Sequence, residues 1–406
     1  MGRRAVKRWW IRAGEDRRRR VWLAGHQGRA VDVVVSHAEV NDRHGTAVLT
    51  QRLFGLDPDV VSVRSHDDYD ARQRFGAWSV RIPHPRPADP AAARRLRRAF
   101  RGVLIRRVVA IPFYPDDVRN ALALADLGSG PLGTYVMDDQ NVEAAGIPDA
   151  LLLSLLARST LRLAISEELR DAYQTKFGLP FTFLPPLIDP ALVLRTPAMP
   201  PREALERRHG VMIGNVWGQG WLSRLCRTVS DAGLEIDWFS SAGLNWHVLG
   251  VAELGRAGIR WHPGPPDEEL VQVLRRAAFA LLPTGTLDAE DDHRAIARLS
   301  LPSKLVYTTA AAHLPTLVLG HPDTAAARFV TRTGVGMALP YDGRALAAAV
   351  DEVVRPEVQA EIRARAAELA PAFSAEGVGE WIWRSLSAGG AVDDRWGRLG
   401  RTPVAR

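Results

Sequence analysis

The amino-acid sequence predicts an α/β protein with two Rossmann-like domains that face a cleft. The chain of 406 residues is too long for one ordinary core, so two domains are expected. Two series of short apolar runs alternate with helical segments, and a proline-rich stretch at 190–201 separates the two series. In each series a glycine-containing loop follows the first apolar run, which is typical of the first strand–helix unit of a doubly wound sheet.

Composition excludes several classes of protein. Cys226 is the one cysteine, so no disulfide forms within the chain, and no run of about 18 apolar residues is present to span a membrane. The N-terminus lacks the apolar core of a signal peptide. We therefore expect a cytoplasmic protein, and we expect neither a metal nor another cofactor.

Residues 1–30 form a basic tail with ten Lys or Arg residues against Glu15 and Asp16. The tail carries a charge of +8, so the other residues carry about −1 and nucleic-acid binding by them is not expected. Basic residues alternate here with Trp9, Trp10 and Trp22, a pattern that suits an anionic membrane surface and a peripheral location at the inner face of the cell membrane. The alternative is a disordered extension.

The first series, residues 31–190, predicts one domain. We expect strands at 31–36, 59–64, 77–82, 108–111, 133–137 and 161–165, and helices at 47–54, 90–100, 117–125, 148–157 and after Ser166. The loop after the first strand contains Asn41, His44, Gly45 and Thr46. Ligands bind at such carboxyl ends, although a structural turn explains the glycine equally well.

Carboxylates follow the strand at 133–137. Asp138 and Asp139 face the expected cleft, where they serve as a base, as an acceptor anchor or as caps of the next helix. Asp68-Tyr-Asp70 matches the metal-binding Asp-x-Asp pattern of another transferase fold, but its place in a polar loop indicates a chance match.

The second series, residues 210–370, follows a linker at 191–209. We expect strands at 210–213, 236–240, 259–262, 279–282 and after Pro315, with helices at 222–232, 267–278, 342–354, 357–369 and 377–386, and a disordered tail at 389–406. The glycine loop after the first strand includes Gly214 and Asn215 and allows close approach of a ligand, although its spacing is not the dinucleotide fingerprint. An acidic loop at 288–293 suits a solvated surface better than a metal site.

The stretch from Arg298 to Tyr307 predicts an anion site at the start of a helix. Pro302 suits a first helical turn, and Ser300 or Ser303 is placed to cap its amides. Lys304 is one of three lysines in a chain with 50 arginines, which indicates that a compact point charge is needed there. Free amides, the helix dipole and an ammonium group favour a phosphate or diphosphate. The alternative is an ordinary capped helix with a solvated lysine.

These residues resemble the GT-B glycosyltransferases, specifically bacterial sugar transferases related to family four. The resemblance covers about residues 31–386. It rests on Ser36 through His44-Gly-Thr46, on the strand that ends in Asp138-Asp139, and on two further segments. These segments are Ala164-Ile-Ser-Glu-Glu-Leu-Arg170 with Leu184-Pro-Pro186, and Leu299-Ser-Leu-Pro-Ser-Lys-Leu305 followed by Leu314-Pro-Thr-Leu-Val-Leu-Gly320.

The resemblance implies transfer of a sugar from a nucleotide-sugar donor to a glycan or lipid-linked acceptor, in cell-surface polysaccharide or glycoconjugate synthesis. It implies that the second domain binds the donor and the first binds the acceptor, with the helix at 377–386 crossing back to the first. It implies that Ser303 and Lys304 hold the donor diphosphate, that the Gly214 loop lies near it, and that the loop with Gly45 faces the donor phosphates or the acceptor.

Position and resemblance together give three sets of candidate residues. The candidates are Asp138, Asp139 and His44 for catalysis; Gly214, Asn215, Arg298, Ser300, Ser303 and Lys304 for the donor; and Asn41, Gly45 and Thr46 for the acceptor or donor loop.

The sequence departs from the family at one pattern. Many family-four enzymes carry two glutamates seven residues apart, the later of which contacts the ribose, whereas this helix offers Tyr307, Thr308 and Thr309. The ribose contact and the retaining or inverting outcome are therefore unassigned. A nucleotide-sugar epimerase of the same architecture and a catalytically inactive nucleotide-sugar-binding or scaffold protein are the alternatives.

Overall fold

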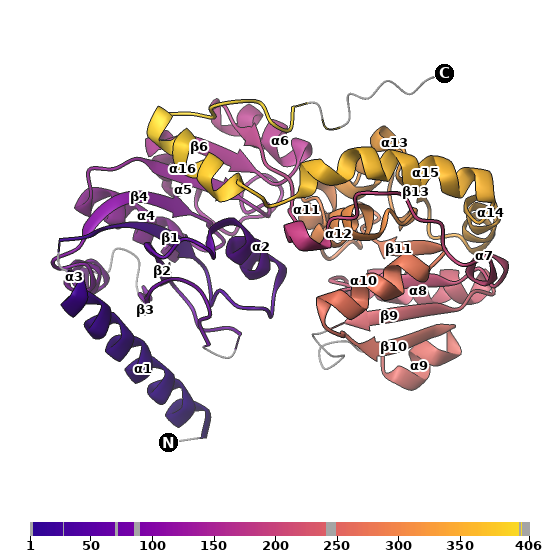
Figure 1. Cartoon of the computed structure of the whole chain (residues 1–406), viewed down its shortest axis with the longest axis horizontal. Helices are drawn as coiled ribbons and strands as arrows, with labels where there is room; N and C mark the ends of the chain where they lie inside the picture. Colours follow the sequence, from indigo (N-terminus) through magenta and orange to yellow (C-terminus); the bar gives the residue numbers. More distant parts are fainter. Residues whose placement is uncertain are drawn as a thin grey trace. The chain divides into compact units, whose positions relative to one another are not determined.

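The computed structural model describes residues 3–26, 28–69, 72–84, 90–240, 249–397 and 399, and of residues 3–9 and 12 only their place in a helix. The chain divides into two units, one formed by residues 1–184 with 377–394 and the other by 185–376 with 395–406. Each unit holds one sheet of parallel strands with helices packed against it (Figure 1). The predicted α/β class with two Rossmann-like sheets is confirmed.

The first unit is built on a seven-stranded sheet in the order β3-β2-β1-β4-β5-β6-β7. Its elements are α1 (Arg3–Gly25), β1 (Ala30–Ser36), α2 (Gly45–Phe54), β2 (Val60–Arg64), β3 (Ser79–Arg81), α3 (Pro90–Ala99), β4 (Leu104–Ala110), α4 (Pro115–Leu127), β5 (Leu132–Val136), α5 (Asp149–Arg158), β6 (Ser159–Ala164), α6 (Glu167–Phe177), β7 (Thr182–Phe183) and α16 (Val378–Ala388). β1 and β2 are buried almost throughout, as apolar runs in the middle of a parallel sheet should be.

Helix α16, from the end of the chain, packs in the first unit. A Cβ on Gly379 would stand 1.9 Å from the backbone oxygen of Leu53, so only glycine permits this close approach to α2. Trp383 of α16 lies 4.9 Å from Phe54, centroid to centroid. The backbone of Gly133 in β5 likewise leaves room for Leu386.

Helix α1 extends from the first unit beside β3 (Figure 1). Its contacts with the unit come from residues spaced three or four apart, which share one helical face. Glu15 forms a buried ion pair with Arg64, 3.0 Å between oxygen and nitrogen. Arg19 donates to the backbone oxygen of Ala99 at 2.9 Å, and the Trp22 ring lies 6.4 Å from that of Trp78. The opposite face is open, with Trp10 65 % and Val21 67 % exposed.

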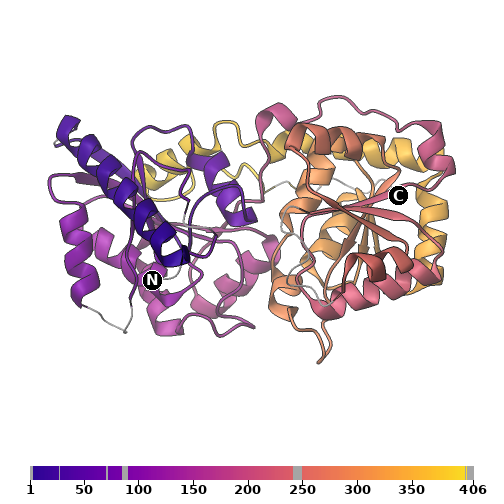
Figure 2. The ribbon, with the colours of Figure 1, turned by 90° about the horizontal axis from the view of Figure 1, so that it is seen from below.

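The second unit is built on a six-stranded sheet in the order β10-β9-β8-β11-β12-β13, with helices on both faces (Figure 2). Its elements are η1 (Pro190–Leu192), α7 (Arg202–Glu206), β8 (Gly210–Ile213), α8 (Gln219–Asp231), β9 (Ile236–Ser240), α9 (Val251–Arg256), β10 (Ile259–Pro263), α10 (Asp267–Arg276), β11 (Phe279–Pro283), α11 (Arg294–Leu299), α12 (Ser303–Ala312), β12 (Thr316–Leu319), α13 (Ala325–Thr333), β13 (Gly336–Leu339), α14 (Gly343–Val353), α15 (Pro356–Leu369) and η2 (Ala370–Phe373). Trp238, Phe279 and Leu317 are central in its core.

A buried arginine holds helix ends together in the second unit. Arg363 of α15 is 1 % exposed and donates to the backbone oxygens of Ala198, Ala277 and Ala312 at 3.0–3.1 Å. Two of these carbonyls follow α10 or end α12, where helical carbonyls lack partners of their own. Burial lowers the pKa of Arg363 to about 10, so the guanidinium stays charged at neutral pH.

The structure differs from the sequence prediction at both ends of the chain. Residues 3–25 form α1, where a disordered extension was one alternative, because Glu15, Arg19 and Trp22 fasten the helix to the first unit. Trp396 lies in the stretch predicted as a disordered tail but is buried, and its indole nitrogen donates to the backbone oxygen of Ala372 at 2.9 Å. Residues 398 and 400–406 lie outside the described residues. Over the described part of the chain, the helices are too short or too polar to cross a bilayer.

Candidate functional site

Lys304, at the start of α12, turns into the second unit instead of pointing to solvent. Its ammonium group donates to the backbone oxygen of Asn215 at 2.7 Å, and it forms no ion pair with a described carboxylate. Burial lowers the pKa of Lys304 to about 8. A partly buried ammonium without a carboxylate partner is costly, and an anionic ligand beside it would reduce that cost.

The glycine loop after β8 lies directly against this lysine. Gly214 has φ +70°, a left-handed conformation that favours glycine, and a Cβ there would stand 3.8 Å from the Lys304 side chain. The indole of Trp238 donates to the backbone oxygen of Gly214 at 2.7 Å, and Ser240 donates to the Asn215 side chain at 2.8 Å. The structure therefore brings together Gly214, Asn215 and Lys304 from separate parts of the sequence.

The other predicted donor residues surround the start of α12 with different exposure. Helix α12 begins at Ser303, and Pro302 stands at the cap position, one residue earlier than predicted. Neither Ser300 nor Ser303 caps the helix, because no side chain accepts from its first amides. Ser300 is buried, and its hydroxyl has no hydrogen-bond partner among the described residues. Ser303 and Arg298 are exposed, the latter on α11.

The acidic loop at 288–293 contacts the start of α8. Asp291 accepts from the indole of Trp221 at 2.8 Å and from the backbone of Leu287 at 2.9 Å. Asp292 accepts from the first amide of α8, that of Gln219, at 3.2 Å. Across the described residues, no group of three His, Cys, Asp or Glu side chains is placed to hold a metal.

The predicted loop of the first unit lies at the carboxyl end of β1. His44 stands at the cap position of α2 and bonds through Nε2 to the backbone oxygen of Glu39 at 3.0 Å, while Gly45 and Thr46 begin the helix. Burial lowers the pKa of His44. Asn41 is buried and donates to the backbone oxygens of Tyr69 and Arg72, so its amide holds the loop.

Asp139 organises the loop that follows β5. Its carboxylate accepts from four successive backbone amides, those of residues 141–144, at 2.7–3.1 Å. The hydroxyl of Tyr173 adds a fifth hydrogen bond at 3.1 Å. Asp139 therefore holds a loop and does not cap the next helix, α5, which begins at Asp149 with Pro148 at its cap position. Asp138 is half-buried beside it.

Six rings gather at the same edge of the first sheet, and we call them the ring cluster: His37, His44, His66, Tyr69, Phe113 and Tyr114. Tyr69 stacks on His44 with centroids 4.0 Å apart, and His37 lies 4.3 Å from Phe113. The sequence analysis missed five of the six. The signal that was available is position, because His37, His66 and Phe113 each follow a buried strand by one to three residues.

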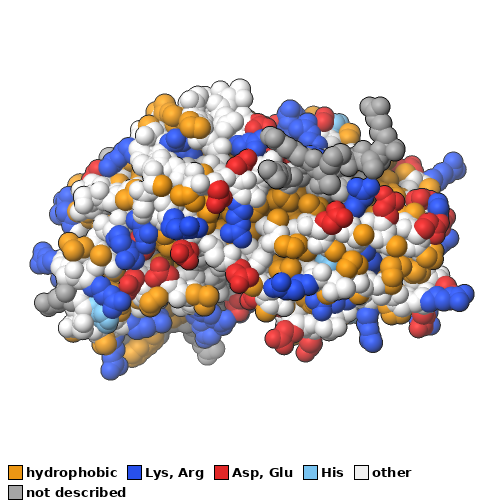
Figure 3. Space-filling model, turned by 45° about the horizontal axis from the view of Figure 1, so that its top comes forward, with side chains coloured by type: hydrophobic (Ala, Val, Ile, Leu, Met, Phe, Trp, Pro, Cys, Tyr) orange, Lys and Arg blue, Asp and Glu red, His pale blue; other side chains and the backbone are white. Residues whose placement is uncertain are grey.

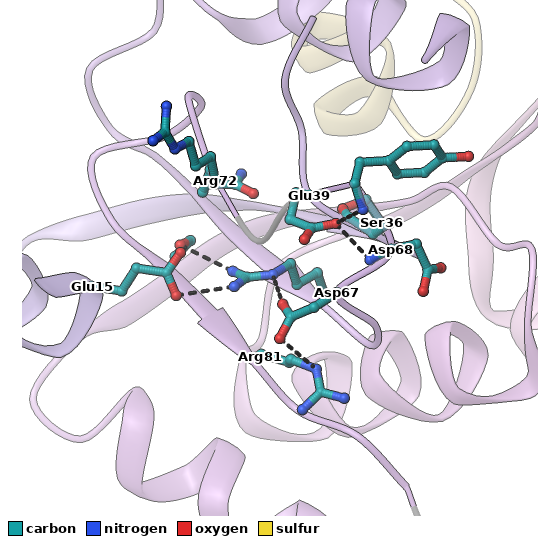
Figure 4. A network of polar contacts seen from close by, with 12 residues as sticks. Glu15, Ser36, Glu39, Asp67, Asp68, Arg72 and Arg81 are labelled. Atoms are coloured by element: carbon teal, nitrogen blue, oxygen red, sulfur yellow. Dashed lines mark hydrogen bonds and ion pairs between the residues drawn. The ribbon is translucent and has the colours of Figure 1, made fainter. Parts of the chain in front are cut away.

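A network of polar contacts holds the loop that carries Tyr69 (Figure 4). Glu39 accepts from the backbone amides of Asp68 and Tyr69 at 2.9 and 3.0 Å. Asp67 pairs with Arg64 at 3.0 Å, and Arg64 reaches Glu15 of α1 on its other side. Burial alone would lower the pKa of Arg64. The carboxylates of Glu15 and Asp67 outweigh burial and raise that pKa above its ordinary value. Of the Asp68-Tyr-Asp70 pattern, Asp70 lies outside the described residues.

Comparison with solved structures identifies the fold. HepE of Anabaena, in complex with UDP, superposes with a TM-score of 0.63 at 12 % identity over 88 % of this chain and 100 % of that one. Sucrose-phosphate synthase of Thermosynechococcus elongatus gives 0.59 at 12 % identity over 89 % and 100 % of the two chains. The chain has the GT-B fold. Trehalose-6-phosphate synthase of Burkholderia multivorans, another GT-B protein, gives 0.57 at 13 % identity over 89 % and 97 %.

The GT-B match covers 88 % of the chain. The two strand–helix series predicted two Rossmann-like domains, and the resemblance of several segments, among them the one that contains Lys304, predicted the GT-B fold. No protein-family model matches the sequence. No curated protein matches it either.

Proposed function

We propose that this protein is a glycosyltransferase that moves a sugar from a nucleotide-sugar donor to a glycan or lipid-linked acceptor. The observation that carries the proposal is the contact between Lys304 and the glycine loop at the carboxyl edge of the second sheet. β8 and β11 are neighbours there, although β9 and β10 lie between them in sequence. Ligands of doubly wound sheets bind at such a switch point.

The chemistry of the donor site follows from charge. Glycosyl transfer develops positive charge on the sugar and negative charge on the leaving diphosphate. The ammonium group of Lys304 and the uncapped amides of α12 are fixed before the reaction, so they stabilise the leaving charge without reorganising. Removing one such group typically reduces kcat by about 10²–10³.

The test is binding of nucleoside diphosphates and their sugar conjugates to wild type, Lys304→Ala and Lys176→Ala. Lys176 is the matched control, because it is a lysine of the first unit that pairs with Asp149. We expect one nucleotide to raise the melting temperature of wild type and Lys176→Ala and not that of Lys304→Ala. Equal stabilisation of all three proteins, or of none, contradicts the proposal.

We further propose that α1 places the enzyme on the anionic inner face of the cell membrane, close to a lipid-linked acceptor of cell-surface polysaccharide or glycoconjugate synthesis. Of the two carboxylates of this helix, Glu15 is taken by Arg64. The open face therefore carries Arg17, Arg18 and Arg20 against Asp16. Basic residues near an anionic surface contribute about 1 kcal/mol each.

Vesicle binding tests the membrane proposal. The double variant Arg17→Glu, Arg18→Glu loses two basic residues and gains two carboxylates, so it should bind phosphatidylglycerol vesicles more weakly than wild type by at least about thirtyfold. The double variant Arg202→Glu, Arg207→Glu changes the net charge equally, at the two ends of α7 (Arg207 is its C-cap), and should bind as wild type does. Equal loss in both variants would show that net charge alone matters and would contradict a role for α1. On the face shown in Figure 3, basic and acidic side chains are interspersed, so this face does not form the basic patch of a nucleic-acid-binding surface.

A further inference from the structure

The ring cluster occupies the switch point of the first sheet. β1 and β4 are neighbours, although β2 and β3 lie between them in sequence. His37 follows β1, His66 and Tyr69 follow β2, and Phe113 and Tyr114 follow β4. The cluster therefore lies where a doubly wound sheet binds its ligand.

Two buried polar groups beside these rings lack hydrogen-bond partners. Glu39 is fully buried, and its Oε2 accepts from the amides of Asp68 and Tyr69, but its Oε1 has no partner among the described residues. His37 is 6 % exposed, and its Nδ1 is likewise without a partner in the described part of the chain. An unpaired buried polar atom is energetically costly, so a ligand that donates hydrogen bonds, directly or through one water, is favoured.

Three carboxylates lie near the rings, those of Glu39, Asp68 and Asp117. Burial lowers the pKa of His37 to about 3, so its imidazole is neutral at physiological pH and offers a lone pair. Burial and the nearby carboxylates of Asp68 and Glu39 raise the pKa of Tyr69. Burial and the carboxylates of Asp68 and Asp117 also raise the pKa of Tyr114. Acceptors in a negative field repel phosphate and attract hydroxyl or amino donors.

The rings themselves supply a surface for an apolar face. Tyr114 is 42 % exposed and lies 4.7 Å from His66, centroid to centroid. Asp117 fixes its position by accepting from the backbone amides of Phe113 and Tyr114 at 2.9 and 2.8 Å. Aromatic rings have a negative face that attracts the weakly positive C–H groups of a sugar.

We propose that the ring cluster and Glu39 bind an uncharged or amino-substituted sugar ring of the acceptor. Hydroxyl groups of that sugar donate to Glu39 and His37, directly or through water, and its C–H face contacts Tyr114. The inference rests on the proposed glycosyltransferase function. It specifies that the part of the acceptor that binds at the ring cluster is a sugar and not a phosphate.

Histidine-selective NMR tests this inference with simple probes. Methyl glucoside, methyl galactoside and glucosamine are added separately, and glycerol 1-phosphate is the anionic probe. At least one sugar should shift the signals of His37, His44 and His66, each assigned by a His→Gln variant. The signals of His209 and His262 in the second unit should not move, and glycerol 1-phosphate should move none of the five.

Two variants sharpen the test. Glu39→Gln keeps one oxygen for the amides of Asp68 and Tyr69 but replaces the unpaired acceptor with a donor, so the sugar-induced shifts should be lost. Tyr114→Ala should weaken them several-fold. Leu153→Ala on α5 removes an equally exposed side chain of the same unit and should leave the shifts unchanged.

The inference is overturned if no sugar shifts the cluster histidines, if glycerol 1-phosphate shifts them, or if Glu39→Gln responds as wild type does. Thermal stabilisation by nucleoside diphosphates is measured on the same samples. A protein that binds nucleotide but no sugar contradicts this inference alone, whereas a protein that binds no nucleotide contradicts the proposed function.

Discussion

Lys304 predicts a pH dependence of donor binding. Because burial lowers the pKa of Lys304 to about 8, the free protein loses this charge as the pH rises through that value. A bound diphosphate favours the charged form and raises the pKa again. Affinity for nucleoside diphosphates should therefore fall above a pH of about 8, and binding there should take up a proton. Calorimetry in buffers of different ionisation enthalpy measures that uptake, and the same pH profile in Lys304→Ala would refute the assignment.

Single residues show where prediction from sequence ends. Lys304 stood out because lysine is rare in this chain, and the structure places it against the predicted glycine loop. Asp139 stood out only by its position after a strand. We expected a carboxylate there to face a ligand or to cap the next helix, but Asp139 binds four backbone amides of a loop. These hydrogen bonds depend on the path of residues 140–144, which no local pattern specifies.

At the scale of single elements, Asp237 links neighbouring strands of the second sheet. Burial alone would raise its pKa, but hydrogen bonds from His262, His209 and Arg260 lower the pKa of Asp237 to about 2. The pKa of Asp237 in the folded protein lies below its value of about 3.9 in the unfolded chain, so the ionised carboxylate stabilises the fold. This stabilisation is fully present above a pH of about 3.9 and is lost as the pH falls toward 2. In Asp237→Asn, the free energy of unfolding should fall less between a pH of about 4 and a pH of about 2 than it does in wild type. An unchanged acid profile, measured by urea unfolding, would contradict the assignment.

A buried ion pair between Glu15 and Arg64 is one of the contacts that hold helix α1 to the first unit. In Glu15→Ala, Arg64 keeps Asp67 but loses one acceptor while it stays fully buried. Breaking a buried ion pair typically reduces the free energy of unfolding by about 3–5 kcal/mol. Because Asp67 still pairs with Arg64, we expect a loss at the lower end of this range. Asp16→Ala, one residue away and exposed, should change the free energy of unfolding by less than about 0.5 kcal/mol. Chemical denaturation compares the two, and equal effects would show that Glu15 does not anchor the helix.

Elements with an apolar face were predicted well, and α1 was not. The strands at 31–36 and 236–240 were evident as short runs ended by polar residues, because burial in a parallel sheet demands apolar side chains. In α1 the docked face consists of Glu15, Arg19 and Trp22, which contact the unit through charge and aromatic rings. A search for hydrophobic periodicity cannot detect a helical face of this kind.

At the scale of the whole molecule, the order of strands and helices was sufficient to predict two Rossmann-like sheets. Right-handed crossovers leave few topologies for such a series. The order did not reveal that β1 and β4, or β8 and β11, become neighbours at the switch points. The ring cluster was missed for that reason, since its members follow three different strands.

Hydrogen exchange with and without a nucleoside diphosphate tests the central claim, that the second unit binds the donor at the Lys304 contact. The ligand should protect the amides at 214–222 and 303–306 in wild type and in Lys176→Ala, and this protection should be absent in Lys304→Ala. The first unit should show no protection of comparable size. Protection confined to the first unit, or protection at 303–306 that survives Lys304→Ala, would contradict the account.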